Sequence, residues 1–127
     1  WPQKLGARKA GLYLGQIVRM QEEIGTGGGG FRFLFAAFLE QASVILKNKE
    51  LQEISEEFTK AGDLWRASAV NMGRIYKGRL KEQKDYDACA DMLDQISDIE
   101  KNAFLRLKKM KWRCPYNFLL FIKFCYF

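Results

Sequence analysis

Apolar residues recur every three or four positions along most of the chain, with polar residues between them. The clearest pattern predicts a helix over about 49–77, because its apolar positions alternate spacings of three and four. Such spacing is typical of a seam that packs against other helices. The seam consists of Leu51, Ile54, Phe58, Ala61, Trp65, Ser68, Met72 and Ile75.

Three more helices are predicted around this one. The first covers 7–24 and must end at Gly25, because each glycine inside a helix costs roughly 1 kcal/mol against alanine. Its apolar positions are Leu14, Ile17, Val18 and Ile24. The second begins near Phe31, and its wide apolar stripe predicts a buried helix. This stripe consists of Phe31, Leu34, Phe35, Phe38, Leu39, Ala42, Ile45 and Leu46.

The fourth helix is expected to start with Asp85 as its N-cap and to run to about Lys111. Its expected buried face consists of Cys89, Leu93, Ile96, Ile99, Ala103, Leu107 and Met110. The polar turn at 47–50 and the charged segment at 77–85, with Gly78 as a stop, connect the last three helices. No segment before Pro115 alternates with period two, so no strand is predicted there.

The fold expected from these elements is all-α: a single four-helix bundle-like domain over residues 1–111. A Gly-rich loop joins its first two helices. Residues 112–127, WRCPYNFLLFIKFCYF, form an atypical aromatic tail without a helical stripe. This tail is either a closing element over the core or a non-native end. If it is non-native, residues 113–127 should pack poorly, and their deletion should leave the melting temperature nearly unchanged.

Composition fits one globular domain of 127 residues, with 48% hydrophobic residues and 28% charged residues. The net charge of +6 favours anionic partners. The chain contains no histidine, which excludes Ser-His-Asp and Cys-His catalysis and HExxH zinc sites within it. We expect no metal and no cofactor.

Other features bear on location. Three cysteines, Cys89, Cys114 and Cys125, show no CxxC pairing, which fits a reducing cytoplasm. No signal peptide and no apolar run of about 18 residues is evident, so a membrane partner is not expected. Because the chain begins with Trp1 rather than Met, we expect it to be a fragment, a processed product or a trimmed chain.

The segment EEIGTGGGGFRFLF (22–35) holds the candidate site residues: Gly25, Thr26, Gly27, Gly28, Gly29, Gly30 and Arg32. A dinucleotide loop would follow a strand, and a Walker A loop would need Lys and Ser or Thr after its last glycine. Neither condition is met here. Two interpretations stay open. The run either contacts an anion or a neighbouring domain in an exposed loop, with Arg32 adding charge, or it is a hinge between helices.

Two further features have ordinary structural interpretations. The basic stretch RLKKMKWR (106–113) fits a solvated helix end, since cations favour helix C-termini, and it lacks nucleic-acid-binding motifs. Cys89 lies on an apolar face and is expected to be inert core. Nucleic acid is therefore not an expected partner.

Three segments in order, EEIGTGGGGFRFLFAAFLEQA (22–42), EEFTKAGDLWR (56–66) and YDACADMLDQISDIEKNAFLRL (86–107), carry a resemblance. The chain resembles the C-terminal domain, of unknown function, of butirosin biosynthesis protein H-like proteins. The resemblance covers about residues 1–111 and excludes the tail.

That resemblance implies an accessory helical domain of an acyltransferase that moves an acyl group from a carrier protein to an amine in antibiotic biosynthesis. The catalytic cysteine and histidine would lie in an N-terminal papain-like domain, so no catalytic residue is assigned in this chain. The implied partners are that domain and an acyl carrier protein. The alternative is a non-enzymatic basic helical module that binds an acidic protein.

Overall fold

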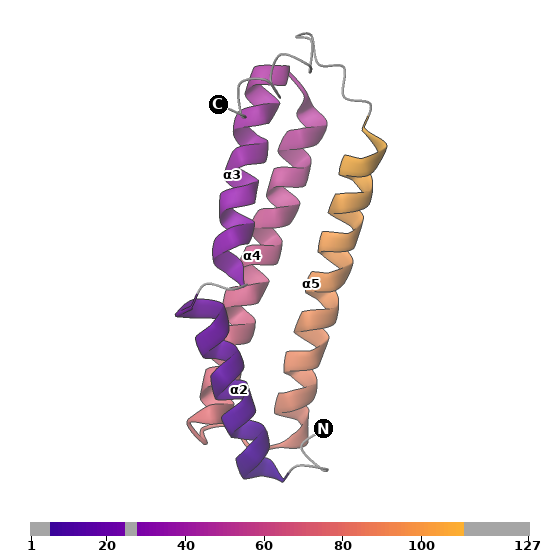
Figure 1. Cartoon of the computed structure of the whole chain (residues 1–127). Coiled ribbons are helices and arrows are strands. Elements are labelled where there is room, and N and C mark those ends of the chain that lie inside the picture. Colours follow the sequence, from indigo (N-terminus) through magenta and orange to yellow (C-terminus); the bar gives the residue numbers. More distant parts are fainter. Residues whose placement is uncertain (1–5, 25–27, 111–127) are drawn as a thin grey trace.

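The computed structural model describes residues 6–24 and 28–110, which form four helices (Figure 1). In chain order they are α2 (Ala7–Glu22), α3 (Gly29–Leu46), α4 (Lys49–Tyr76) and α5 (Gln83–Lys109). No strand occurs among the described residues. The expected all-α, four-helix bundle-like fold is therefore confirmed.

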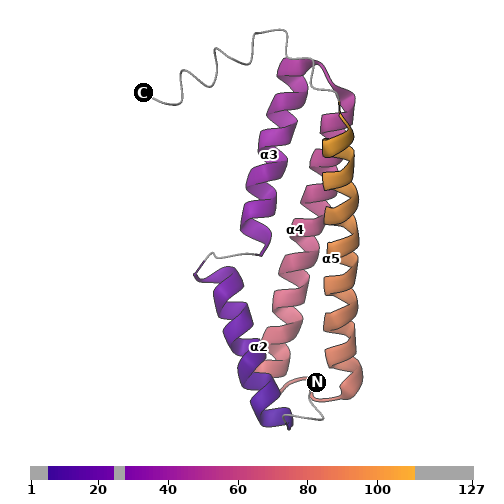
Figure 2. The same ribbon diagram turned by 45° about the vertical axis from the view of Figure 1, so that its right-hand side comes forward.

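Helix α4 runs the length of the domain and packs against each of the other three helices. Helices α2 and α3 follow one another along one side of α4, and α5 lies along another side (Figures 1 and 2). This central position explains why α4 has the most regular pattern. All residues of its predicted seam are buried except Trp65, which is half-buried.

The core has two clusters, one at each end of α4. The first joins α3, α4 and α5 through Ala36, Leu39, Leu51, Ile54, Phe58 and Ala103. The ring of Phe58 meets Phe35 and Phe104 edge to face, with centroids 4.8 and 5.1 Å apart. The second cluster joins α2, α4 and α5 through Leu14, Met72, Ile75 and Cys89. The expectation that Cys89 belongs to the core is confirmed.

The helix ends follow from local chemistry. Lys47 adopts the left-handed conformation after α3, and the Asn48 side chain caps α4 by accepting from the Glu50 N–H at 2.9 Å. Gly78, at φ +70°, follows the end of α4 as expected. The prediction that Asp85 is the N-cap of α5 is wrong. Glu82 is the N-cap, and Asp85 is the third helical residue of a capping box, which bonds back to the Glu82 N–H.

Three apolar predictions fail. Ile24 lies beyond the end of α2 and is exposed, and Leu93, expected on the buried face of α5, is 36% exposed. More importantly, five of the eight residues in the predicted stripe of α3 are exposed, because α3 packs mainly against α4 and only one face of it reaches the core. The aromatic tail lies outside the described residues, so the expectation that it packs poorly stays a prediction.

Candidate binding surfaces

The glycine run ends inside a helix. Gly28, at φ +77°, is the N-cap of α3, and Gly29 and Gly30 are its first helical residues. Gly28 and Gly29 are buried, so the expectation of an exposed loop is wrong at these two positions. Gly25, Thr26 and Gly27 lie outside the described residues, and their candidate role stays a prediction.

Close packing explains why Gly29 has no side chain. A Cβ atom at Gly29 would lie 2.9 Å from the backbone oxygen of Gly62, where α3 meets α4. A Cβ atom at Gly62 would lie 2.8 Å from the ring of Phe33. Backbone meets backbone at this crossing, which only glycine permits. The hinge interpretation therefore accounts for Gly28 and Gly29, whereas no atom crowds a Cβ at Gly30.

Arg32 takes part in a polar network between three helices. Its Nε and Nη2 atoms donate to the two carboxylate oxygens of Glu100 at 2.7 and 3.1 Å, a bidentate pair. The indole N–H of Trp65 donates to Glu100 Oε1 at 3.0 Å, and the guanidinium lies 5.0 Å from the Trp65 ring centroid. Arg32 also donates to the Gly28 carbonyl at 3.3 Å.

These contacts perturb the Glu100 carboxylate. Burial by itself would raise the pKa of Glu100, but hydrogen bonds from Arg32 and Trp65, together with the Arg32 charge, lower the pKa below its usual value. Glu100 therefore stays ionised and balances the charge of Arg32. Three of the five guanidinium N–H groups are used in this network. Whether Arg32 also contacts a ligand or a domain stays a prediction.

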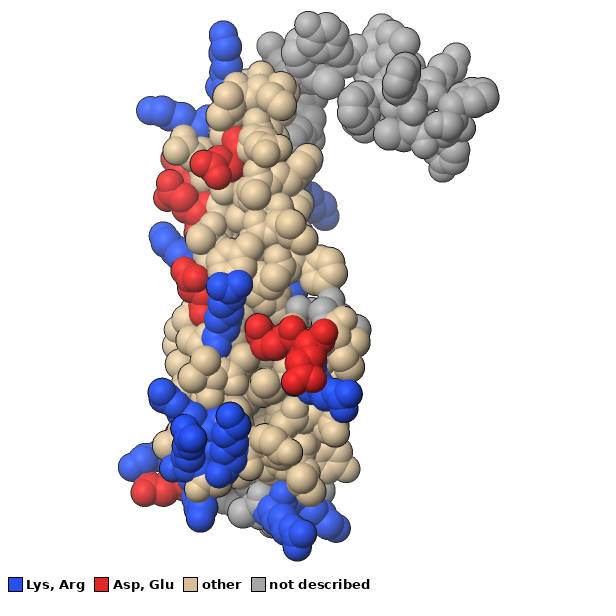
Figure 3. All heavy atoms as spheres, turned by 90° about the vertical axis from the view of Figure 1, so that its left-hand side faces the viewer, with Lys and Arg blue, Asp and Glu red and all other residues tan. Residues whose placement is uncertain are grey.

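The outward side of α3 is an uncovered apolar surface. Four of its large side chains, spaced three, four and seven residues apart, are 56 to 78% exposed. We call this set the α3 face; it consists of Phe31, Leu34, Phe38 and Ile45. Figure 3 shows the uncharged band that runs over the upper half of the domain, where α3 lies. Phe104 of α5 extends it, because Phe35 stacks on both Phe38 and Phe104 at 6.1 Å.

A helix that is apolar on every side is normally buried on every side. Within the described residues, α3 is the one helix long and apolar enough to cross a membrane by length and composition, although the core helix of a soluble protein passes the same test. Arg32 and Glu40 interrupt the apolar positions of α3, so this helix contains no unbroken apolar run of that length. Among the described residues, the side chains of the α3 face are large, apolar and more than half exposed.

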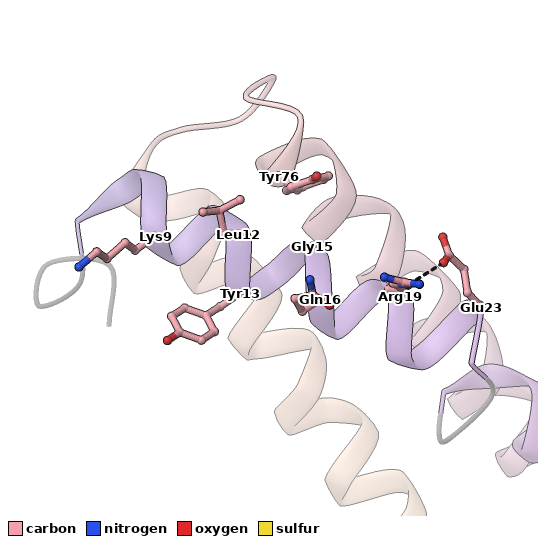
Figure 4. Close-up of a pocket in the computed structure, with 8 residues that line it drawn as sticks. All are labelled: Lys9, Leu12, Tyr13, Gly15, Gln16, Arg19, Glu23 and Tyr76. Carbon is pink, nitrogen blue, oxygen red and sulfur yellow. Dashed lines mark ion pairs between the residues drawn. The ribbon is translucent and has the colours of Figure 1, made fainter.

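A second surface surrounds Tyr76, where the end of α4 packs against α2. Three depressions of about 670, 260 and 720 Å³ share the Tyr76 side chain, and we call them together the Tyr76 groove. The first of them is drawn in Figure 4, with Leu12 and Gly15 of α2 beside the tyrosine ring. A Cβ atom at Gly15 would lie 2.6 Å from that ring, so glycine lets Tyr76 lie against the α2 backbone.

Basic side chains dominate the Tyr76 groove. Its eight basic residues are Arg8, Lys9, Arg19, Arg66, Arg74, Lys77, Arg79 and Lys81. Glu22 and Glu23 are the acidic ones, and Glu23 pairs with Arg19 at 3.2 Å. Lys and Arg gather in the lower half of Figure 3, where α2 lies. This surface was not predicted from the sequence, although Arg66, Arg74 and Lys77 recur at spacings of eight and three, which places them on one face of α4.

Two other candidate features have structural roles. Arg106, from the predicted basic helix end, donates to Glu53 and Glu57 at 2.6 and 2.7 Å, and these hydrogen bonds raise its pKa further. Burial, with a smaller effect from Asp85, raises the pKa of the Cys89 thiol, so little of it is the reactive thiolate. Within 6–24 and 28–110, no group of His, Cys, Asp or Glu side chains could hold a metal ion.

Fold and surfaces together define a helical domain with an uncovered apolar helix and a basic groove. Residues 1–107 match a family described as "Domain of unknown function (DUF4872)", and the chain belongs to this family. Neither the comparison with curated proteins nor the comparison with solved structures gives a match.

Proposed function

We propose that the chain is an accessory, non-catalytic helical domain of a butirosin-biosynthesis-H-like acyltransferase. In this proposal the α3 face docks on a papain-like domain that carries the catalytic cysteine and histidine. The acyl group would move from a carrier protein to an amine in antibiotic biosynthesis, in a bacterial cytoplasm. The resemblance of the three quoted segments suggests this enzyme class, and the geometry supports the accessory role.

The α3 face is the observation that carries the proposal. Each of its four side chains exposes more than half of its surface, and transfer of apolar surface from water is favourable by about 25 cal/mol per Å². A neighbouring domain that covers α3 would complete the burial that α4 provides on its other side. Exposed apolar patches of this kind mark sites of interaction with other proteins or domains.

An acyl-transfer assay tests the proposal. The purified 127-residue chain is mixed with an acyl carrier thioester and an aminoglycoside amine, with and without a separately produced papain-like domain of the same protein. We expect product only when the papain-like domain is present. Product formed by the 127-residue chain alone would refute the accessory role. An open reading frame without any papain-like domain would refute the assignment to this enzyme class.

A second candidate function is a non-enzymatic helical module that binds an acidic protein partner. The Tyr76 groove favours it, because eight basic side chains there outnumber two acidic ones. The two candidates use different surfaces, and one domain can perform both functions. A carrier protein of acidic character would fit the groove while a catalytic domain covers α3.

A further inference from the structure

We propose that the Tyr76 groove binds an acidic amphipathic helix of a partner protein. This inference rests on the second candidate function and adds to it the site, the shape of the ligand and the residues that recognise it. It does not depend on the α3 face, which lies on the other half of the α2–α3 side of the domain.

The floor of the groove is apolar. Leu12, Val70 and Tyr76 are 52 to 54% exposed, and they come from α2 and α4, which border the groove. The Tyr76 ring lies flat against α2 at Gly15, so the floor is continuous between the two helices. Helix-binding grooves on proteins have this construction, in which apolar side chains of the ligand enter at helical spacing.

The rim of the groove is cationic on both sides. Lys9 and Arg19 stand at opposite ends of the depression along α2 (Figure 4). Arg74, Lys77 and Arg79 border the other depression at the end of α4, and no ion pair within the described part of the chain occupies them. Carboxylates on the flanks of a bound helix would therefore find unpaired cations, and they would steer its approach.

Apolar floor and cationic rim together select the ligand. A nucleic acid presents its charges along a polar backbone and uses stacked bases for apolar contact, which requires aromatic platforms in series. Three tyrosines, Tyr13, Tyr76 and Tyr86, line the groove, but only Tyr76 borders all three depressions, and aliphatic side chains line each of them as well. Glu22 and Glu23 would repel a polyanion that tracks the whole groove, whereas a helix can place its few carboxylates beside Lys9, Arg74 and Lys77. The pattern therefore favours an acidic amphipathic helix.

Fluorescence anisotropy tests this site with a labelled peptide of about 18 residues, which is five helical turns. The peptide contains only Glu and Leu at amphipathic spacing. We expect the peptide to bind the domain, and we expect its affinity to fall as salt is added. The double variant Arg74→Glu/Lys77→Glu should bind the peptide at least tenfold more weakly than the parent chain. The control Lys108→Glu/Lys109→Glu makes the same change of charge at the exposed end of α5 and should leave binding intact. Circular dichroism of both variants should show unchanged helix content.

Comparison ligands decide the remaining outcomes. A pure Glu peptide should bind at least tenfold more weakly, because it cannot use the apolar floor. Tighter binding of a single-stranded oligonucleotide or of phosphatidylglycerol vesicles than of the Glu–Leu peptide would overturn the inference. If the Arg74/Lys77 and Lys108/Lys109 double variants lost affinity equally, the Tyr76 groove would not be the binding site. The second candidate function would still be supported. Failure of the acidic peptide to bind at any salt concentration would refute both.

Discussion

Gly29 and Gly30 are neighbours in the sequence, but they have different surroundings. Both belong to the first turn of α3. A Cβ atom at Gly29 would clash with the backbone oxygen of Gly62, whereas a Cβ atom at Gly30 would have no neighbour within 4 Å. The sequence could show that the run breaks a helix, but not which of its glycines the packing requires. That difference depends on the crossing of α3 and α4, where Gly29 meets Gly62, a residue 33 positions later in the sequence.

Alanine substitutions should separate the two glycines. We expect Gly30→Ala to raise the free energy of unfolding by up to about 1 kcal/mol, because alanine is the better helix former and meets no clash. Gly29→Ala should lower it, by about 1–3 kcal/mol, because the α3–α4 crossing must open. Urea unfolding followed by circular dichroism measures both changes. Equal effects of the two substitutions would contradict the hinge interpretation of Gly29.

The Glu100 network gives stability a pH dependence. The pKa of Glu100 is lower in the folded chain than in the unfolded chain, where it is about 4.3. Glu100 therefore contributes its full stabilisation at pH values above the unfolded pKa, and this stabilisation is lost as the pH falls through the folded pKa. We expect Glu100→Gln to be less stable than the parent chain at pH 7, and the difference to shrink between about pH 5 and pH 3. Urea midpoints across this range measure it, with Glu22→Gln, an exposed position on α2, as the control. A difference that grows on acidification would contradict the network.

No local signal in the sequence indicates this network. Arg32 and Glu100 are separated by 68 residues, whereas Glu22 and Glu23 lie much nearer to Arg32 in the sequence. Glu23 instead pairs with Arg19 one turn away. Trp65 was expected in the core for its spacing, and its indole N–H explains why it is only half-buried, since it reaches the Glu100 carboxylate.

At the scale of elements, periodicity located all four helices, and their bounds in the structure differ from the expected ones by about two residues at most ends. For α3, however, apolar residues on nearly all sides gave no indication of which side faces α4. Only the packing shows that Leu39 is buried while Ile45 is exposed. An uncovered side of this kind is not visible in a sequence, because it depends on which neighbours the chain provides.

Two glutamine substitutions on α3 test this difference. Leu39→Gln should lower the free energy of unfolding by about 2–5 kcal/mol, because it replaces a buried apolar side chain by an amide without hydrogen-bond partners. Ile45→Gln should change it by no more than about 0.5 kcal/mol, because the side chain already meets water. Thermal unfolding of the purified chain is a sufficient measurement. A large loss of stability from Ile45→Gln would show that the α3 face is covered in the isolated chain.

At the scale of the whole molecule, the basic composition is distributed unevenly. The net charge of +6 predicted anionic partners but not their place. The structure concentrates basic residues around Tyr76, while Arg106 is held by a row of glutamates on α4. On the side formed by α2 and α3, an uncharged band therefore lies in the upper half and most of the basic residues lie in the lower half (Figure 3).

Docking through the α3 face is the central claim, and titration calorimetry tests it most directly. The 127-residue chain is titrated with the separately produced papain-like domain of the same protein. We expect saturable binding that the double variant Leu34→Glu/Phe38→Glu weakens at least tenfold, because each Glu would have to lose its water in the interface. The matched control Leu12→Glu/Val70→Glu, which adds the same two charges at exposed apolar positions on α2 and α4, should bind as the parent chain does. Unchanged affinity in the α3 double variant would contradict the claim.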